Sequence, residues 1–173
     1  LSYVFHLLAG RLLGPDAYGE LGALMALFFI FTLPASAIGF GVSKFAARLN
    51  SQNLTSEIGH LQNKFQKIVL FLSIFILIVM MIFANKIIHL LNIDRTIYIY
   101  IVGLSALPSF LLSVNRGILQ GVFKYDWFSI NCIVEAVIRL ALLGTMLQLG
   151  FGTIGALLSF GIAYLLAFLL TFP

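Results

Sequence analysis

The sequence predicts an all-α protein, a polytopic bundle of six transmembrane helices, from three observations. Of its 173 residues, 61% are hydrophobic and only 9% are charged, whereas soluble domains are about 45–50% apolar and about 25% charged. The apolar residues are gathered in six stretches that polar connections separate. These stretches lack the alternation over about ten residues that is typical of membrane barrel strands. The composition therefore excludes a soluble domain, and it also excludes a disordered chain.

The six spans follow from the apolar stretches, because about 20 apolar residues cross the hydrocarbon core of a bilayer. The first stretch is too short to cross alone and begins with Leu1, so we expect a fragment whose first span is truncated. The second, third and fourth are flanked by charged residues, and the fifth and sixth are separated by Gly150, which predicts a tight helical hairpin. The expected spans are residues 1–13, 21–46, 68–84, 97–114, 128–149 and 151–172.

The connection before the third span has a helical period of its own. Leu54, Ile58, Leu61, Phe65 and Ile68 recur at helical spacing, and polar side chains fill the opposite side. This pattern fits a short amphipathic helix that lies on the cytoplasmic leaflet before the third span begins. The alternative is an ordinary solvated linker.

Basic residues in the connections predict the orientation in the membrane, because cytoplasmic connections carry an excess of Lys and Arg. Six lie in the second and fourth connections: Lys44, Arg48, Lys64, Lys67, Arg116 and Lys124. Three lie on the other side: Arg11, Lys86 and Arg95. We therefore expect a multi-pass protein of the cell membrane whose N-terminus and Pro173 are cytoplasmic. We interpret the net charge of +4 as a consequence of these orientation signals and not as a sign of nucleic-acid binding.

The candidate site is a polar stripe in the fifth span. Asn131, Glu135 and Arg139 follow one another at intervals of four residues, so they share one face of a helix. A charge at mid-membrane costs about 2.5–3.5 kcal/mol on insertion scales, and the stripe should therefore face the bundle interior or a water-filled cavity. One interpretation is a cavity wall where Arg139 meets an anionic substrate and Glu135 holds it in place. The other is a neutralising pair that only fixes helix packing.

Two more polar residues, Arg116 and Gln120, share a helix face at the cytoplasmic end of the fourth span. They are candidates for the cytoplasmic lip of the same cavity. The alternative is that they anchor the helix end at the interface, with the long side chain of Arg116 reaching toward water.

Proline and small residues predict local features of two spans. Pro34, Gly39 and Gly41 lie close together in the second span, so we expect a kink there, either as a static bend or as a hinge beside a substrate path. In the sixth span, small residues at intervals of four predict a helix-packing stripe. The members of this stripe are Gly155, Ser159, Ala163 and Ala167.

Motifs for enzymatic chemistry are absent from the sequence. It contains no phosphate-binding G-x-x-x-x-G-K-[ST] loop, no G-x-S-x-G and no H-E-x-x-H. His6, His60 and His89 are far apart, and the chain has a single cysteine, Cys132, so no metal site is expected. We therefore predict a protein that is not an enzyme and needs no cofactor.

Three segments resemble a known family. The stretch RLLGPDAYG at residues 11–19 resembles the sequence after the first span of polysaccharide (O-antigen type) flippases, and RGILQG at residues 116–121 resembles the end of their fourth span. Residues 131–139, followed by LGFG at residues 149–152, are similar to their fifth span and the turn into the sixth. These flippases belong to the multidrug/oligosaccharidyl-lipid/polysaccharide exporter superfamily.

The resemblance implies half of a two-lobe, alternating-access transporter. Residues 1–173 would be one lobe, with the second lobe missing, and the implied partner besides the bilayer is a lipid-diphosphate-linked glycan moved to the outer leaflet. It also implies that Arg116, Glu135 and Arg139 line the cavity. At residues 36–38 the chain has Ser-Ala-Ile, where family members often carry an acidic residue. This difference argues against a proton- or cation-coupling role for the second span. The alternatives are a drug or small-cation exporter of the same superfamily, or a non-catalytic scaffold of a glycan-assembly complex.

Overall fold

The computed structural model describes residues 2–91, 93 and 95–171, and these residues form helices and no strand. The helices are α1 (Ser2–Leu13), α2 (Pro15–Ser51), α3 (Thr55–Leu91), α4 (Ile97–Gly121), α5 (Tyr125–Gln148) and α6 (Gly152–Leu169). Helices α2 to α6 are long and apolar enough to cross a membrane, whereas the 12-residue α1 is too short. The predicted all-α membrane bundle is confirmed. The predictions for Leu1, Phe172 and Pro173 lie outside the described residues.

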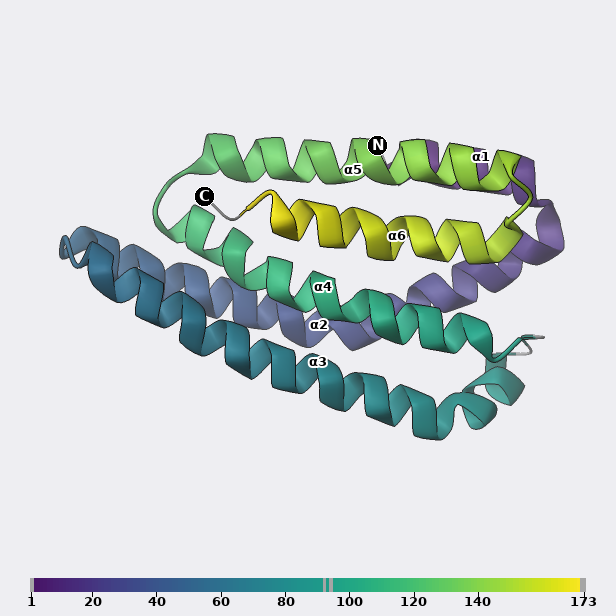
Figure 1. Ribbon diagram of the computed structural model, residues 1–173, viewed down its shortest axis with the longest axis horizontal. Helices are drawn as coiled ribbons and strands as arrows, with labels where there is room; N and C mark the ends of the chain where they lie inside the picture. The colour runs from purple at the N-terminus through teal and green to yellow at the C-terminus, as the bar shows by residue number, and fades with distance from the viewer. Residues whose placement is uncertain (1, 92, 94, 172–173) are drawn as a thin grey trace.

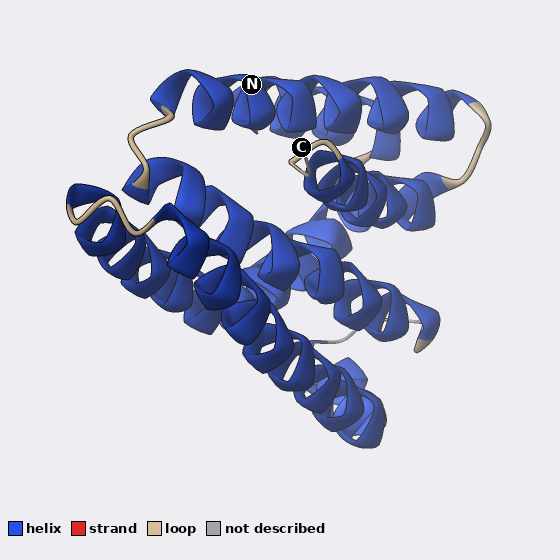
Figure 2. Cartoon of the chain, turned by 60° about the vertical axis from the view of Figure 1, so that its left-hand side comes forward, coloured by secondary structure: helices blue, strands red, loops and turns tan. Residues whose placement is uncertain are grey.

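Helix α4 is central in the bundle. It packs against α2, α3 and α6, and α6 also packs against α5. Figure 1 shows α2 and α3 as a long antiparallel pair, with α4 beside them and α6 between α4 and α5. Figure 2 shows the same bundle from another side. Short turns join the neighbours; in the turn between α5 and α6, Gly150 adopts a φ of 81°, a conformation that glycine reaches without strain.

Helices α2 and α4 approach each other closely through glycine. A β-carbon at Gly117 would lie 2.5 Å from the backbone oxygen of Gly39, and one at Gly121 would lie 2.5 Å from that of Ser43. Only a residue without a side chain fits such positions, which is how helices in a bilayer bring their backbones together. Gly39 is therefore part of a helix contact, whereas Gly41 has no neighbour within 4 Å of an added β-carbon.

The predicted kink lies in α2, and the predicted packing stripe lies on α6. α2 continues through Pro34 without interruption, and Figure 1 shows that the helix changes direction about halfway along its length. Whether this bend moves stays a prediction. The four small residues of the predicted stripe are all buried on α6: Gly155, Ser159, Ala163 and Ala167.

Helices α2 and α3 each contain 37 residues, which corresponds to about 55 Å at 1.5 Å per residue, against about 30 Å of hydrocarbon. The expectation of a separate surface helix before the third span is wrong, because that segment is the first part of α3. Gln62 and Gln66 hydrogen-bond to Asn115 of α4 at 3.0 and 2.9 Å. These bonds keep the segment in line with the rest of α3 and against α4.

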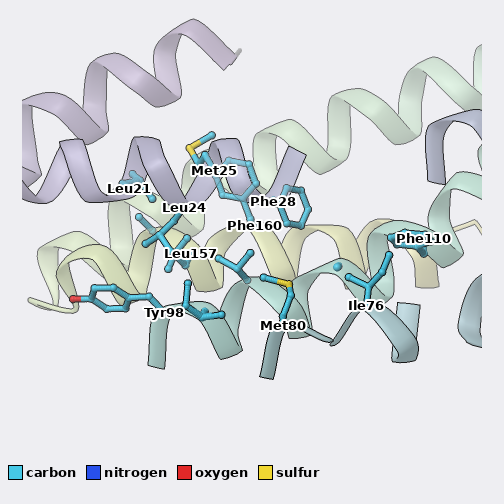
Figure 3. Close-up of a cluster of buried hydrophobic side chains, with 14 of the residues drawn as sticks. Leu21, Leu24, Met25, Phe28, Ile76, Met80, Tyr98, Phe110, Leu157 and Phe160 are labelled. Carbon is cyan, nitrogen blue, oxygen red and sulfur yellow. The ribbon is translucent and has the colours of Figure 1, made fainter. Parts of the chain in front are cut away.

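Apolar side chains from four helices fill the middle of the bundle (Figure 3). Phe28 of α2, Met80 of α3, Phe110 of α4 and Phe160 of α6 all belong to this buried cluster. Large apolar side chains also cover the outside, as with Phe71 of α3, which is 76% exposed. Apolar residues on both the inner and the outer face are expected for a helix surrounded by lipid.

Candidate functional site

Three charged side chains meet inside the bundle. Arg116 Nη2 lies 3.1 Å from Glu135 Oε2, and Arg139 Nη1 lies 3.2 Å from Glu135 Oε1. Each oxygen of the carboxylate therefore binds one guanidinium, the first from α4 and the second from the next turn of α5. We call Arg116, Glu135 and Arg139 the charge cluster. With two cations and one anion, it has a net charge of +1.

Asn131 joins the charge cluster to a third helix. Arg116 Nε donates a hydrogen bond to Asn131 Oδ1 at 2.8 Å, and Asn131 Nδ2 donates to the backbone oxygen of Ala167 at 2.8 Å. Asn131 and Glu135 are only 6% and 7% exposed. Buried polar groups of this kind need partners, and here the partners hold α4, α5 and α6 together around Arg116.

The charge cluster lies deep in the membrane. Glu135 is the eleventh residue of α5, which begins at Tyr125, so it stands about 15 Å along the helix axis at 1.5 Å per residue. That depth is close to the middle of about 30 Å of hydrocarbon. Charges at this depth are expensive, and they usually face the interior of a bundle, as this cluster does.

Arg139 is packed among aromatic rings. Its guanidinium carbon lies 4.8 Å from the ring centroid of Phe160 and 5.8 Å from that of Phe5, both within the range of cation–π attraction. Its Nε is buried and has no hydrogen-bond partner in the described part of the chain. Arg139 borders a space of only about 40 Å³, which is room for little more than one water molecule.

Arg116 instead borders a larger cavity of about 310 Å³ between α2, α4, α5 and α6. Gln120 lies one turn further along α4 and faces the same cavity, and α2 contributes the hydroxyls of Thr32 and Ser36 to its lining. Tyr164 contributes its ring from α6. Among the described residues that line the cavity there is no Asp or Glu. The arrangement therefore offers a guanidinium, hydroxyls and an amide to a ligand, which suits an anionic group that also accepts hydrogen bonds.

The structure brings together most of the residues that the sequence singled out. Asn131, Glu135 and Arg139 share one inward face of α5, as predicted, and Arg116 joins them from α4. The larger cavity is bordered by Arg116 and Gln120 but not by Arg139. Which of these residues contacts a substrate stays a prediction.

Sequence reasoning missed a second polar group near one end of the bundle. Asn115 is 3% exposed. Its Oδ1 accepts from the two glutamines of α3, and its Nδ2 donates to the hydroxyl of Thr171 at 2.7 Å. The signal was present in the sequence, because Gln62 and Gln66 are one helical turn apart and Asn115 ends an apolar run. Nothing in the sequence paired them, since about 50 residues separate the partners.

The described residues contain no group of three or more His, Cys, Asp or Glu that could hold a metal ion. Of the three histidines, His6 lies 3.1 Å from the hydroxyl of Tyr18 through its Nδ1. This contact joins α1 to the start of α2 and has no ligand geometry.

Charged side chains that apolar helices enclose beside a cavity are typical of polytopic membrane proteins with a substrate or ion pathway. The sequence matches the MatE family over residues 1–143, and the chain belongs to this family, whose members are transporters and not enzymes. It is 32% identical over 171 residues to an uncharacterised membrane protein of Methanocaldococcus jannaschii; the match covers 95% of this chain and 39% of the relative. The chain thus spans about two fifths of that relative's length. No solved structure matches it.

Proposed function

We propose that the chain is one lobe of a two-lobe transporter that moves a lipid-diphosphate-linked oligosaccharide from the cytoplasmic to the outer leaflet by alternating access. The observation that carries this proposal is Arg116 at the wall of the 310 Å³ cavity, within a buried cluster whose net charge is positive. The segments that resemble polysaccharide flippases, among them the one that contains Arg116, support the same substrate class.

Arg116 has the chemistry that a diphosphate requires. Its planar guanidinium donates hydrogen bonds in a fixed fork that matches phosphate oxygens. Within the described part of the chain, Asn131 and Glu135 use its Nε and Nη2, which leaves Nη1 for a ligand. Asn131 and Glu135 thus orient the guanidinium before a substrate arrives, and this lowers the entropic cost of binding.

The first alternative, a drug or small-cation exporter, needs a carboxylate that a cation can reach. Glu135 is buried between two arginines. Residues 36–38 of α2 are Ser-Ala-Ile, and Ser36 is the one of the three that lines the cavity. These observations favour an anionic substrate. The second alternative, a scaffold without transport activity, gives no reason for a cavity bordered by the half-buried Arg116, several hydroxyls and an amide.

The test uses the full-length protein in lipid vesicles that carry a fluorescent lipid-diphosphate oligosaccharide. We expect Arg116→Ala to reduce transfer between the leaflets at least tenfold, because the lost hydrogen bond to a charged group is worth about 1.5–3 kcal/mol. Arg116→Lys should retain part of the wild-type transfer. Lys86→Ala removes a cation near the C-terminal end of α3, away from the cavity; it is the matched control and should transfer normally. Wild-type transfer by a correctly folded Arg116→Ala variant would overturn the proposal.

A further inference from the structure

A second cavity, which shares no lining residue with the one beside Arg116, opens where α4 ends, α5 begins and α6 ends. Figures 1 and 2 show these three helix ends at the same end of the bundle. The cavity has a volume of about 490 Å³. Its walls are mainly apolar and include Leu119, Ile130, Val134 and Leu170. We call it the apolar groove.

The rim of the apolar groove is amphipathic. Lys124, in the turn between α4 and α5, lines the groove and is exposed, and Trp127 beside it is 63% exposed. Tryptophan and lysine at helix ends are typical of the membrane–water interface, where the headgroups lie. The rim therefore lies at headgroup depth.

The walls of the apolar groove reach deeper. Ile130 and Val134 follow Tyr125, the first residue of α5, by five and nine positions, which is about 7 and 13 Å along the axis. Hydrocarbon lies at that depth. The groove therefore combines an apolar pocket at acyl-chain depth with an ammonium at headgroup depth.

We infer that the apolar groove binds one anionic phospholipid, with an acyl chain between α4, α5 and α6 and its phosphate at Lys124. The length of the groove along α5 suits a hydrocarbon chain, and the ammonium supplies the charge that a phosphate complements. Asp126 is exposed nearby but does not line the groove, so Lys124 is the charge that faces the occupant. The proposal does not depend on the transported substrate.

Occupation of the apolar groove would also matter for the charge cluster. Asn131, which orients Arg116, also lines the groove. A bound chain there keeps water away from the hydrogen bond between these two side chains, and hydrogen bonds are stronger where water is excluded.

The test is photocrosslinking of the full-length protein in vesicles. The probe is phosphatidylglycerol with a diazirine on one acyl chain, and phosphatidylcholine with the same chain is the second arm. We expect adducts on Leu119, Ile130 and Val134. Lys124→Gln should lower the phosphatidylglycerol adduct about fivefold, the contribution of one cation near an anionic surface, and leave the phosphatidylcholine adduct unchanged.

Two matched variants separate the apolar groove from the general lipid surface. Ile130→Trp should fill the groove and abolish the adducts there, whereas Ile82→Trp, at a lipid-facing position of α3 that is 71% exposed, should leave them unchanged. Equal adduct yields in the two variants would overturn the inference. So would an absence of groove adducts in the wild type, which is the result expected if the polypeptide after Thr171 fills the groove.

Discussion

The charge cluster gives the sharpest test of the structure, through Glu135→Gln. This variant keeps the shape of the side chain and removes its charge. Arg116 and Arg139, which both bind the Glu135 carboxylate, would then face a neutral amide at mid-membrane and repel each other.

The magnitude follows from the distances and the burial. At an effective dielectric constant of about 20, opposite charges about 4 Å apart attract by about 4 kcal/mol, and desolvation offsets much of this. Removing one partner of a buried pair typically costs about 3–5 kcal/mol. The arginine side chains are 19% and 12% exposed, so water reaches them in part. We therefore expect the free energy of unfolding to fall by about 3 kcal/mol.

The assay is unfolding of the full-length protein by SDS in lipid–detergent micelles, followed by circular dichroism. The double variant Glu135→Gln/Arg139→Gln restores the net charge of +1 and should recover about 1–2 kcal/mol of the loss, as coupled neighbours do. Arg139→Gln alone leaves Glu135 paired with Arg116, and it should cost less than Glu135→Gln.

Two results would refute this reasoning. The first is a loss below about 1 kcal/mol for Glu135→Gln, the size expected of a surface ion pair. The second is a double variant less stable than Glu135→Gln alone. Either result would mean that the two arginines are not held by one shared carboxylate.

Two further predictions concern helix packing. Gly117→Ala places a β-carbon 2.5 Å from the backbone oxygen of Gly39 and should cost about 1–3 kcal/mol, as overpacking does; Gly144→Ala, with nothing within 4 Å, should be neutral or slightly stabilising in the same SDS titration. Asn115→Leu removes two hydrogen bonds between α3 and α4 and one to Thr171 in the turn after α6, and it should cost about 1–2 kcal/mol. It should also speed hydrogen exchange in the first turns of α3, and unchanged exchange there would contradict the role given to Asn115.

The class of the fold could be read from the sequence because lipid imposes a strong pattern. A span needs about 20 apolar residues, and the short first stretch, the Gly150 turn and the long apolar runs all followed that rule. The start of α3 did not, since its glutamines and lysines look like those of a surface helix. Their partner, Asn115, lies about 50 residues away, and a local pattern carries no information about such a contact.

The candidate site was predictable to the extent that it lies on one helix. The spacing of Asn131, Glu135 and Arg139 placed all three on one inward face of α5. That Arg116 of α4 also binds Glu135 depends on how α4 lies beside α5, which the spacing along one helix does not give. The packing of α4 against α2 depends on Gly117 and Gly121. The G-x-x-x-G spacing of these glycines was visible in the sequence, but their contact with α2 was not.

The length of α2 and α3 has a practical consequence for structure determination. At about 55 Å each, the two helices exceed the roughly 30 Å of hydrocarbon by about 25 Å, and Figure 1 shows their connecting turn extending past the turn between α4 and α5. Small membrane proteins are hard to align in electron micrographs because the detergent belt hides them. A rigid pair of helices emerging from that belt is a natural epitope for an antibody fragment that would serve as an alignment marker.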